Sequence, residues 1–129
     1  MHRVICSSAT EAFFETVKLD HVAWKNSIYD SIISGRLDSA QAVADHTSCR
    51  LGQWYYAGEG VKAYSGLHSF SRLEQPHEQV HRSGLAALHA ARDKQVDQVI
   101  RHLAQMEEAS LKVGELIGEM AREAARASR

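Results

Sequence analysis

The sequence predicts an all-α fold, a four-helix bundle in which one of the four elements is interrupted. Two observations lead to this fold class. The 129 residues include a single proline and many good helix formers, among them Ala, Leu, Glu, Gln and Arg. Apolar residues also recur three and four positions apart over three long stretches, which is the spacing of one buried helix face. A chain of this length makes one domain, so we expect residues 1–129 to form a single bundle.

Charge and hydropathy exclude two classes of partner. The formal net charge is −1, which provides no electrostatic attraction to nucleic acid or to an anionic membrane. No apolar run approaches the ~18 residues that a membrane span needs, and the N-terminus lacks the apolar segment of a signal peptide. We therefore expect a cytoplasmic protein, in which a disulfide between Cys6 and Cys49 is disfavoured.

The first long helix is expected to begin near Ser8 and to end at Gly35. Residues 8–11 have the form of a capping box, in which Ser8 caps the helix and Glu11 reaches back. Glycine is the usual residue just past a helix end, which suits Gly35. The stripe between these ends consists of Phe14, Val17, His21, Trp24 and Ile28. His21 therefore occupies a position where the pattern calls for an apolar residue.

The interrupted element follows this helix. Residues 38–39 can open a short segment, and residues 45–48 are of the types that cap helices or turn the chain. Residues 49–56 predict a short helix that ends at Gly58. From there to Ser69 the pattern indicates an ordered loop that can include one turn of helix.

Two further long helices complete the predicted bundle. The first runs from about Phe70 to Ala91, and Pro76 suits either its first turn or an early kink. Asp93 can cap the helix after it. Each helix has a stripe at helical spacing: Phe70, Leu73, His77, Val80, Gly84 and Leu88 in one, and Val99, Leu103, Met106, Ser110, Val113, Ile117 and Met120 in the other. The second stripe is a heptad-like seam suited to antiparallel packing.

Four residues are candidates for binding a metal in the core of this bundle. His77 and His81 are four residues apart, so they point from one helix face, and both lie in or beside the apolar stripe. His21 and Cys49 are the other two. Each has a simpler interpretation, because a single buried histidine is usually a hydrogen-bonded core residue and a buried cysteine a small hydrophobe. Together, three imidazoles and one thiolate form a closed tetrahedral set that suits zinc.

The remaining histidines receive no place in this set. His46 lies three residues before Cys49, and we assign it to capping or to support of the ligands because four protein ligands already fill a zinc site. The others are interpreted as surface or packing residues: His2, His68, His89 and His102.

Three blocks of the sequence resemble the signature of a known family. They are Leu-Asp-His-Val-Ala-Trp-Lys at 19–25, Asp-His-Thr-Ser-Cys-Arg-Leu-Gly-Gln-Trp-Tyr at 45–55 and Pro-His-Glu-Gln-Val-His at 76–81. In this order they resemble the chemoreceptor zinc-binding domain, over roughly residues 13–118. The resemblance implies that one zinc ion is bound by four ligands: His21, Cys49, His77 and His81.

The resemblance also implies a function. Domains of this family are cytosolic helical bundles of bacteria, attached to soluble chemoreceptors and diguanylate cyclases or occurring alone. They act as sensory inputs and are implicated in sensing zinc and hypochlorous acid. We therefore expect a non-enzymatic regulatory domain of chemotaxis or cyclic-di-GMP signalling. Its partner would be a signalling protein of the chemoreceptor or diguanylate cyclase type, and a homodimer is a further possibility.

Two alternatives compete with this interpretation. The residues from His77 to His81 also satisfy the H-E-x-x-H pattern of zinc metallopeptidases, with Glu78 as the general base. The longer form of that motif fails, since Ala87 stands at the third ligand position, and a catalytic zinc needs an open position that a Cys49 thiolate would fill. The other alternative is a structural helical bundle without metal.

Overall fold

The computed structural model describes residues 2–37 and 49–127, and the chain is all-α as predicted. No strand occurs within these two described ranges. Along the chain, the helices are α1 (His2–Ser34), α2 (Arg50–Tyr56), α3 (Glu59–Ala63), α4 (His68–Arg92) and α5 (Val96–Ala127).

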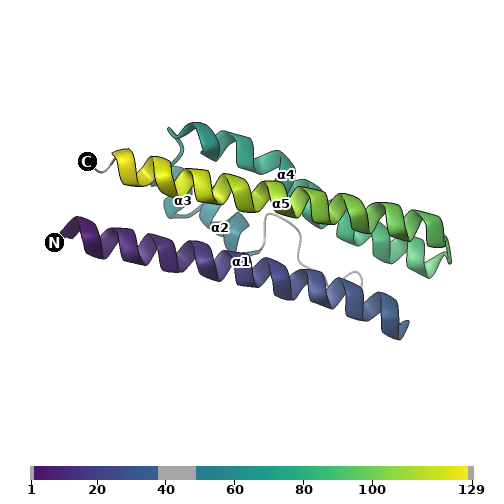
Figure 1. The fold of residues 1–129 in the computed structure, drawn as a ribbon. Helices are drawn as coiled ribbons and strands as arrows, with labels where there is room; N and C mark the ends of the chain where they lie inside the picture. Colours follow the sequence, from purple (N-terminus) through teal and green to yellow (C-terminus); the bar gives the residue numbers. More distant parts are fainter. Residues whose placement is uncertain (1, 38–48, 128–129) are drawn as a thin grey trace.

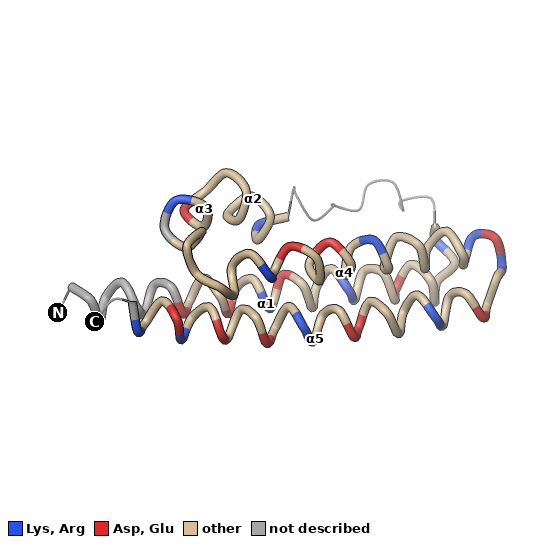
Figure 2. The backbone as a smooth tube through the Cα atoms, turned by 90° about the horizontal axis from the view of Figure 1, so that it is seen from above, with Lys and Arg blue, Asp and Glu red and all other residues tan. Residues whose placement is uncertain are grey.

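Three long helices form the frame of the bundle (Figure 1). Helices α1 and α4 run in one direction and α5 returns in the other, so the start of α1 and the end of α5 lie at the same end of the molecule. The short helices α2 and α3 together form the fourth, interrupted element, on one side of the frame toward that end (Figure 1, Figure 2). Among the described helices, none combines the length and the apolar character needed to cross a bilayer.

The predicted apolar stripes face the core. In α1, Phe14, Val17 and Ile28 are buried, and Trp24 packs against them partly buried. The stripe of α4 is buried along its whole length, including both histidines. In α5 the apolar members of the seam are buried from Met106 onward, and Val99, Leu103 and Ser110 are partly exposed. Lysine and arginine are interspersed with aspartate and glutamate along the long helices (Figure 2).

Two predicted helix caps are wrong, and Pro76 lies deeper in its helix than the first turn. Helix α1 already begins at His2, so Ser8 and Glu11 lie inside it and form no capping box. The residues before Ser8 are helical as well, since extending an existing helix is easier than starting a new one. Pro76 lies well inside α4, where its missing N–H removes one backbone hydrogen bond. Asp93 is the C-cap of α4 and does not cap the next helix, which starts at Val96.

Other predicted boundaries are confirmed. Gly35 follows α1 with a φ of 75°, the left-handed conformation that favours glycine. The loop after α2 contains one short helix, α3, and Gly58 is its N-cap. The predicted turns at residues 38–39 and 45–48, together with His46, lie outside the described residues.

Candidate metal centre

Helix α4 brings His77 and His81 together, one helical turn apart. Both lie in the buried stripe of the helix, with 2% and 5% of their surface exposed. Their ring centroids are 5.0 Å apart and the ring planes are nearly perpendicular, at 82°. The predicted pair therefore exists, and its geometry follows from the four-residue spacing alone.

Helix α1 contributes His21 from the opposite side of the core. The imidazole is 8% exposed, and its centroid lies 5.1 Å from that of His77 and 5.7 Å from that of His81. Burial lowers its pKa below the ordinary value of 6.5, which outweighs the raising effects of Asp20 and of a hydrogen bond to the backbone of Val17. His21 is therefore neutral at pH 7, the state in which imidazole binds metals.

The buried Nε2 of His21 has no hydrogen-bond partner among the described residues. A buried polar nitrogen in that state costs free energy unless another group satisfies it. The hydrogen bond to the Val17 backbone engages the ring elsewhere, which leaves Nε2 directed at the other histidines. A bound cation would satisfy this atom.

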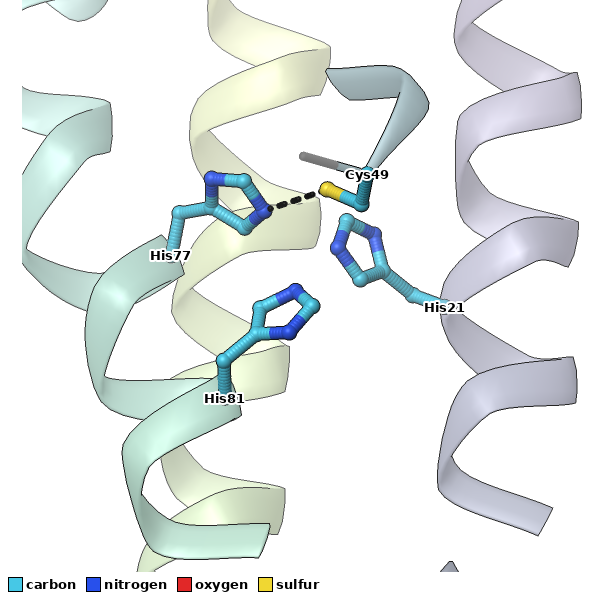
Figure 3. A group of neighbouring side chains, drawn as sticks. All are labelled: His21, Cys49, His77 and His81. Atoms are coloured by element: carbon cyan, nitrogen blue, oxygen red, sulfur yellow. Dashed lines mark hydrogen bonds between the residues drawn. The ribbon is translucent and has the colours of Figure 1, made fainter. Parts of the chain in front are cut away.

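Cys49 stands at the start of α2 and is its N-cap (Figure 3). Its sulfur forms no disulfide with a residue whose side chain the structure describes. Its Sγ lies 3.3 Å from Nε2 of His77 and accepts a hydrogen bond from the backbone N–H of Gly52 at 3.4 Å. The sulfur is thus both directed at a histidine and used to cap the first turn of α2.

The four predicted residues meet at one point between three helices (Figure 3). One donor atom from each, taken from His21, Cys49, His77 and His81, lies within 4.8 Å of all the others. Nitrogen and sulfur ligands of one tetrahedral zinc lie about 3.5 Å apart, as calculated from bond lengths of about 2.1 and 2.3 Å. The 3.3 Å contact between Cys49 and His77 already meets this value. The other donors need to approach by about 1.3 Å at most, so the residues fit a zinc ion.

An ion pair between α1 and α2 lies beside the site. Nε of Arg50, the residue after Cys49, lies 3.2 Å from Oδ2 of Asp20, the residue before His21. The contact ties α2 to α1 directly beside two of the four donors. The sequence analysis did not identify this pair. Opposite charges next to two candidate ligands were the signal that could have revealed the pair.

A cavity of about 250 Å³ opens beside the four donors. Its lining includes His21, Cys49 and His81, together with Trp24 and the Asp20–Arg50 pair. Cys49 is only partly buried, so the cavity gives small solutes access to its sulfur.

The arrangement disfavours the metallopeptidase alternative. Glu78 forms an ion pair with Arg82 one turn further along α4 and is not among the four grouped donors. The sulfur of Cys49 occupies the place that a catalytic zinc keeps open for water.

The other histidines for which the structure gives side-chain positions lie apart from the group. His68 and His89 are exposed, and His102 forms a hydrogen bond with Gln105.

Comparison with known protein families matches residues 21–88 to the chemoreceptor zinc-binding domain. This range starts at the first candidate ligand, includes the other three and covers more than half of the chain, although it is shorter than the expected residues 13–118. The searches of curated proteins and of solved structures each found no match. Sequence blocks, fold and matched range agree, and the chain belongs to the chemoreceptor zinc-binding domain family.

Proposed function

We propose that this protein is a cytoplasmic, non-enzymatic sensory domain of bacterial signal transduction, which binds one zinc ion through His21, Cys49, His77 and His81. The family match and the four converging donors support a zinc-binding signalling domain. We propose further that the site senses zinc, an oxidant such as hypochlorous acid, or both. The single observation that carries the proposal is the meeting of three imidazoles and a thiol in a buried position.

Zinc, when bound, holds the thiol of Cys49 as a thiolate at neutral pH, which is the form that oxidants attack. Hypochlorous acid would transfer an oxygen to this sulfur with release of chloride, so that the sulfur is oxidised to a sulfenic acid while the chlorine is reduced. The cavity beside Cys49 supports access of so small an oxidant. Because the same sulfur caps α2, its oxidation would weaken a ligand and a helix cap together.

Residues 49–58 are the proposed switch element. Loss of the Cys49 contact would free the first turn of α2, while the histidines of α1 and α4 remain on long helices. We propose that this movement is passed to a signalling partner of the chemoreceptor or diguanylate cyclase type, in a chemotaxis or cyclic-di-GMP pathway. A homodimer is a further possible form of the signalling unit.

The zinc site is tested with two histidine variants of the same helix. We expect the parent protein, purified without added metal, to contain one zinc per chain by elemental analysis. His77→Ala should weaken zinc binding by roughly 100-fold or more, because it removes a donor and leaves three. His89→Ala, an exposed histidine on α4, is the matched control and should bind like the parent. A parent protein that binds no zinc at micromolar concentration would overturn the proposal.

The oxidant is tested by following zinc release and circular dichroism during titration with hypochlorous acid. We expect the parent and a Cys6→Ser control to release zinc at similar doses, and Cys49→Ser to lose this response. Equal responses of parent and Cys49→Ser would exclude Cys49 as the redox switch and leave zinc sensing as the function.

The assignment as a non-enzymatic domain has its own test. Glu78→Gln should leave zinc content and fold unchanged, since Glu78 pairs with Arg82 on α4. Zinc-dependent peptidase activity in the parent that disappears in this variant would favour the metallopeptidase alternative.

A further inference from the structure

Trp24 lies against one of the metal-site histidines. It follows His21 by three residues on α1, so it projects from the same helix face. The ring centroids of Trp24 and His81 are 4.4 Å apart, with the planes inclined at 48°. Trp24 also lines the cavity beside the four donors. One side chain of α1 is therefore in direct contact with a candidate ligand of α4.

Gly84 provides the space that the indole occupies. It follows His81 by three residues on α4 and is buried. A Cβ atom at this position would lie 2.5 Å from Cη2 and 2.8 Å from Cζ3 of Trp24, and 3.1 Å from Sδ of Met106. Glycine is a poor residue for a helix interior, so its presence here is explained by the close approach of the indole. The missing side chain leaves a notch on α4, defined by Gly84 and filled by Trp24.

The indole is held in the notch by shape. Its Nε1 is buried and has no hydrogen-bond partner among the described residues, so no polar contact of that atom fixes the ring. The polar contacts that α1 makes nearby go to other helices: Lys25 pairs with Glu107 of α5, and Asp20 pairs with Arg50 of α2. The fit of Trp24 into the notch is therefore a close contact between α1 and α4 at the level of the metal site.

We infer that Trp24 is a positioning residue for the zinc site: seated in the Gly84 notch, it places His21 of α1 against His77 and His81 of α4 and supports the ring of His81. This inference rests on the proposed zinc binding. Zinc ligands must lie within about 0.2 Å of their ideal distances. A Cβ at position 84 would need Cη2 to move from 2.5 Å to an ordinary contact of about 3.5 Å, a shift of about 1 Å. A fifth of that shift, passed to His81 through its contact with the indole, already reaches the tolerance of a zinc ligand.

The test is Gly84→Ala, with Gly114→Ala of α5 as the matched control. Both replace a glycine in a helix interior, but a Cβ at Gly114 meets no atom within 4 Å. We expect Gly84→Ala to weaken zinc binding by about tenfold or more, measured by competition with a chelator. The absorption spectrum of the cobalt-substituted protein should change as well, because it reports ligand geometry. Gly114→Ala should keep the parent affinity and spectrum, and its metal-free form should melt no earlier than the parent.

A second substitution keeps the test sharp. Trp24→Phe in the Gly84→Ala background removes the outer ring atoms that clash, Cη2 and Cζ3, so it should recover much of the lost zinc affinity. Trp24→Phe alone leaves the notch partly empty and should weaken zinc binding by about threefold to tenfold. This single variant tests the inference even if Gly84→Ala does not fold.

The outcomes separate this inference from the proposed function. Parent-like zinc affinity and cobalt spectrum in both Gly84→Ala and Trp24→Phe would overturn the inference and leave zinc binding intact. An equal loss of affinity in Gly84→Ala and Gly114→Ala, or no recovery in the double variant, would also overturn it, since the effect would then be general to the fold. A parent protein that binds no zinc overturns both.

Discussion

The α4–α5 pair and the short helix α2 bring ligands to the same site by different means. Helices α4 and α5 are 25 and 32 residues long and bury apolar side chains along much of their facing surfaces. Helix α2 has seven residues, of which Leu51, Gly52 and Tyr55 are buried. A helix this short is not stable by itself in water, so its position depends on tertiary contacts. Two of the histidines therefore stand on a long helix with an extensive buried face, whereas the cysteine caps a helix whose position depends on its tertiary contacts.

Ring contacts and hydrogen bonds hold the C-terminal half of α2. Tyr55 donates a hydrogen bond to the carbonyl oxygen of Phe70 at 2.6 Å, and the two rings stack with centroids 4.1 Å apart. Tyr56 donates to Glu74 at 2.9 Å. Both contacts join the C-terminal half of α2 to α4. The N-terminal half is held by the Asp20–Arg50 pair and by Cys49. Bound zinc would therefore stabilise the N-terminal half of α2 more than its C-terminal half.

Removal of zinc should produce the largest difference in stability between α2 and the long helices. We expect the metal-free protein to remain helical by circular dichroism, because the stripes of the long helices are buried without the ion. The loss of stability is about 4 kcal/mol at a free zinc concentration a thousand times the Kd. In hydrogen exchange, amides of α2 should lose protection first. Simultaneous loss of protection in α2 and α4 would show that the frame also depends on the metal.

Two buried leucines provide the next largest contrast. Leu73 of α4 is 0% exposed and Leu51 of α2 is 1% exposed, so their replacement by alanine removes the same group from equally buried positions. Leu73→Ala should lower the free energy of unfolding of the whole domain by about 2–5 kcal/mol. Leu51→Ala should lower it less and should instead increase the reaction rate of the Cys49 thiol with a thiol reagent in the metal-free protein.

The free energy of unfolding and the reactivity of Cys49 should be measured on the same metal-free samples of the two variants. Equal losses of global stability in the two variants, with unchanged reactivity of Cys49, would mean that α2 and the frame unfold as one unit.

The stability of the metal-free protein should depend on pH through His21. Burial lowers the pKa of this imidazole below 6.5, its ordinary value in the unfolded chain. Between the folded-state pKa and 6.5 the unfolded chain binds more protons, so the free energy of unfolding falls as the pH drops through this range. Chemical denaturation at several pH values should reveal this slope, and His21→Gln should reduce it. A slope unchanged by the substitution would assign the pH dependence to other groups.

The smallest effect is expected where α1 meets α5. Glu107 accepts hydrogen bonds from Lys25 at 2.8 Å and from Tyr29 at 2.7 Å, and its side chain is 44% exposed. Glu107→Gln should therefore cost only about 1 kcal/mol. Burial, followed by the hydrogen bond to Glu107, raises the pKa of Tyr29 to about 12. The variant should lower this pKa while burial keeps it above 10, as measured by ultraviolet titration of a protein whose other tyrosines are replaced by phenylalanine.

A pKa of Tyr29 unchanged in Glu107→Gln would mean that the contact does not persist in solution. The raised pKa of Tyr29 also affects stability. Above pH 10 the folded protein keeps the Tyr29 proton that the unfolded protein loses, so the free energy of unfolding falls as the pH rises.

The three long helices and the buried face of each could be predicted from the sequence alone. The stripes of α1, α4 and α5 follow from spacings of three and four residues, which are properties of a single helix. The pairing of His77 with His81 and the end of α1 at Gly35 are local in the same way. Local signals were less reliable for helix starts, since Ser8 and Asp93 can cap a helix but stand inside or behind one here.

The contacts between helices were decided by the tertiary structure. The residue types made His21 and Cys49 candidates beside the histidine pair, spacing left their roles open, and the family resemblance implied that all four bind one ion. The Cys49–His77 contact, the Asp20–Arg50 pair and the seat of Trp24 at Gly84 have no signature in any single segment. Each joins residues on different helices, and their meeting depends on the distance and rotation of those helices in the bundle. A helical pattern fixes which face of a helix is buried, but it does not fix which residue of another helix that face will meet.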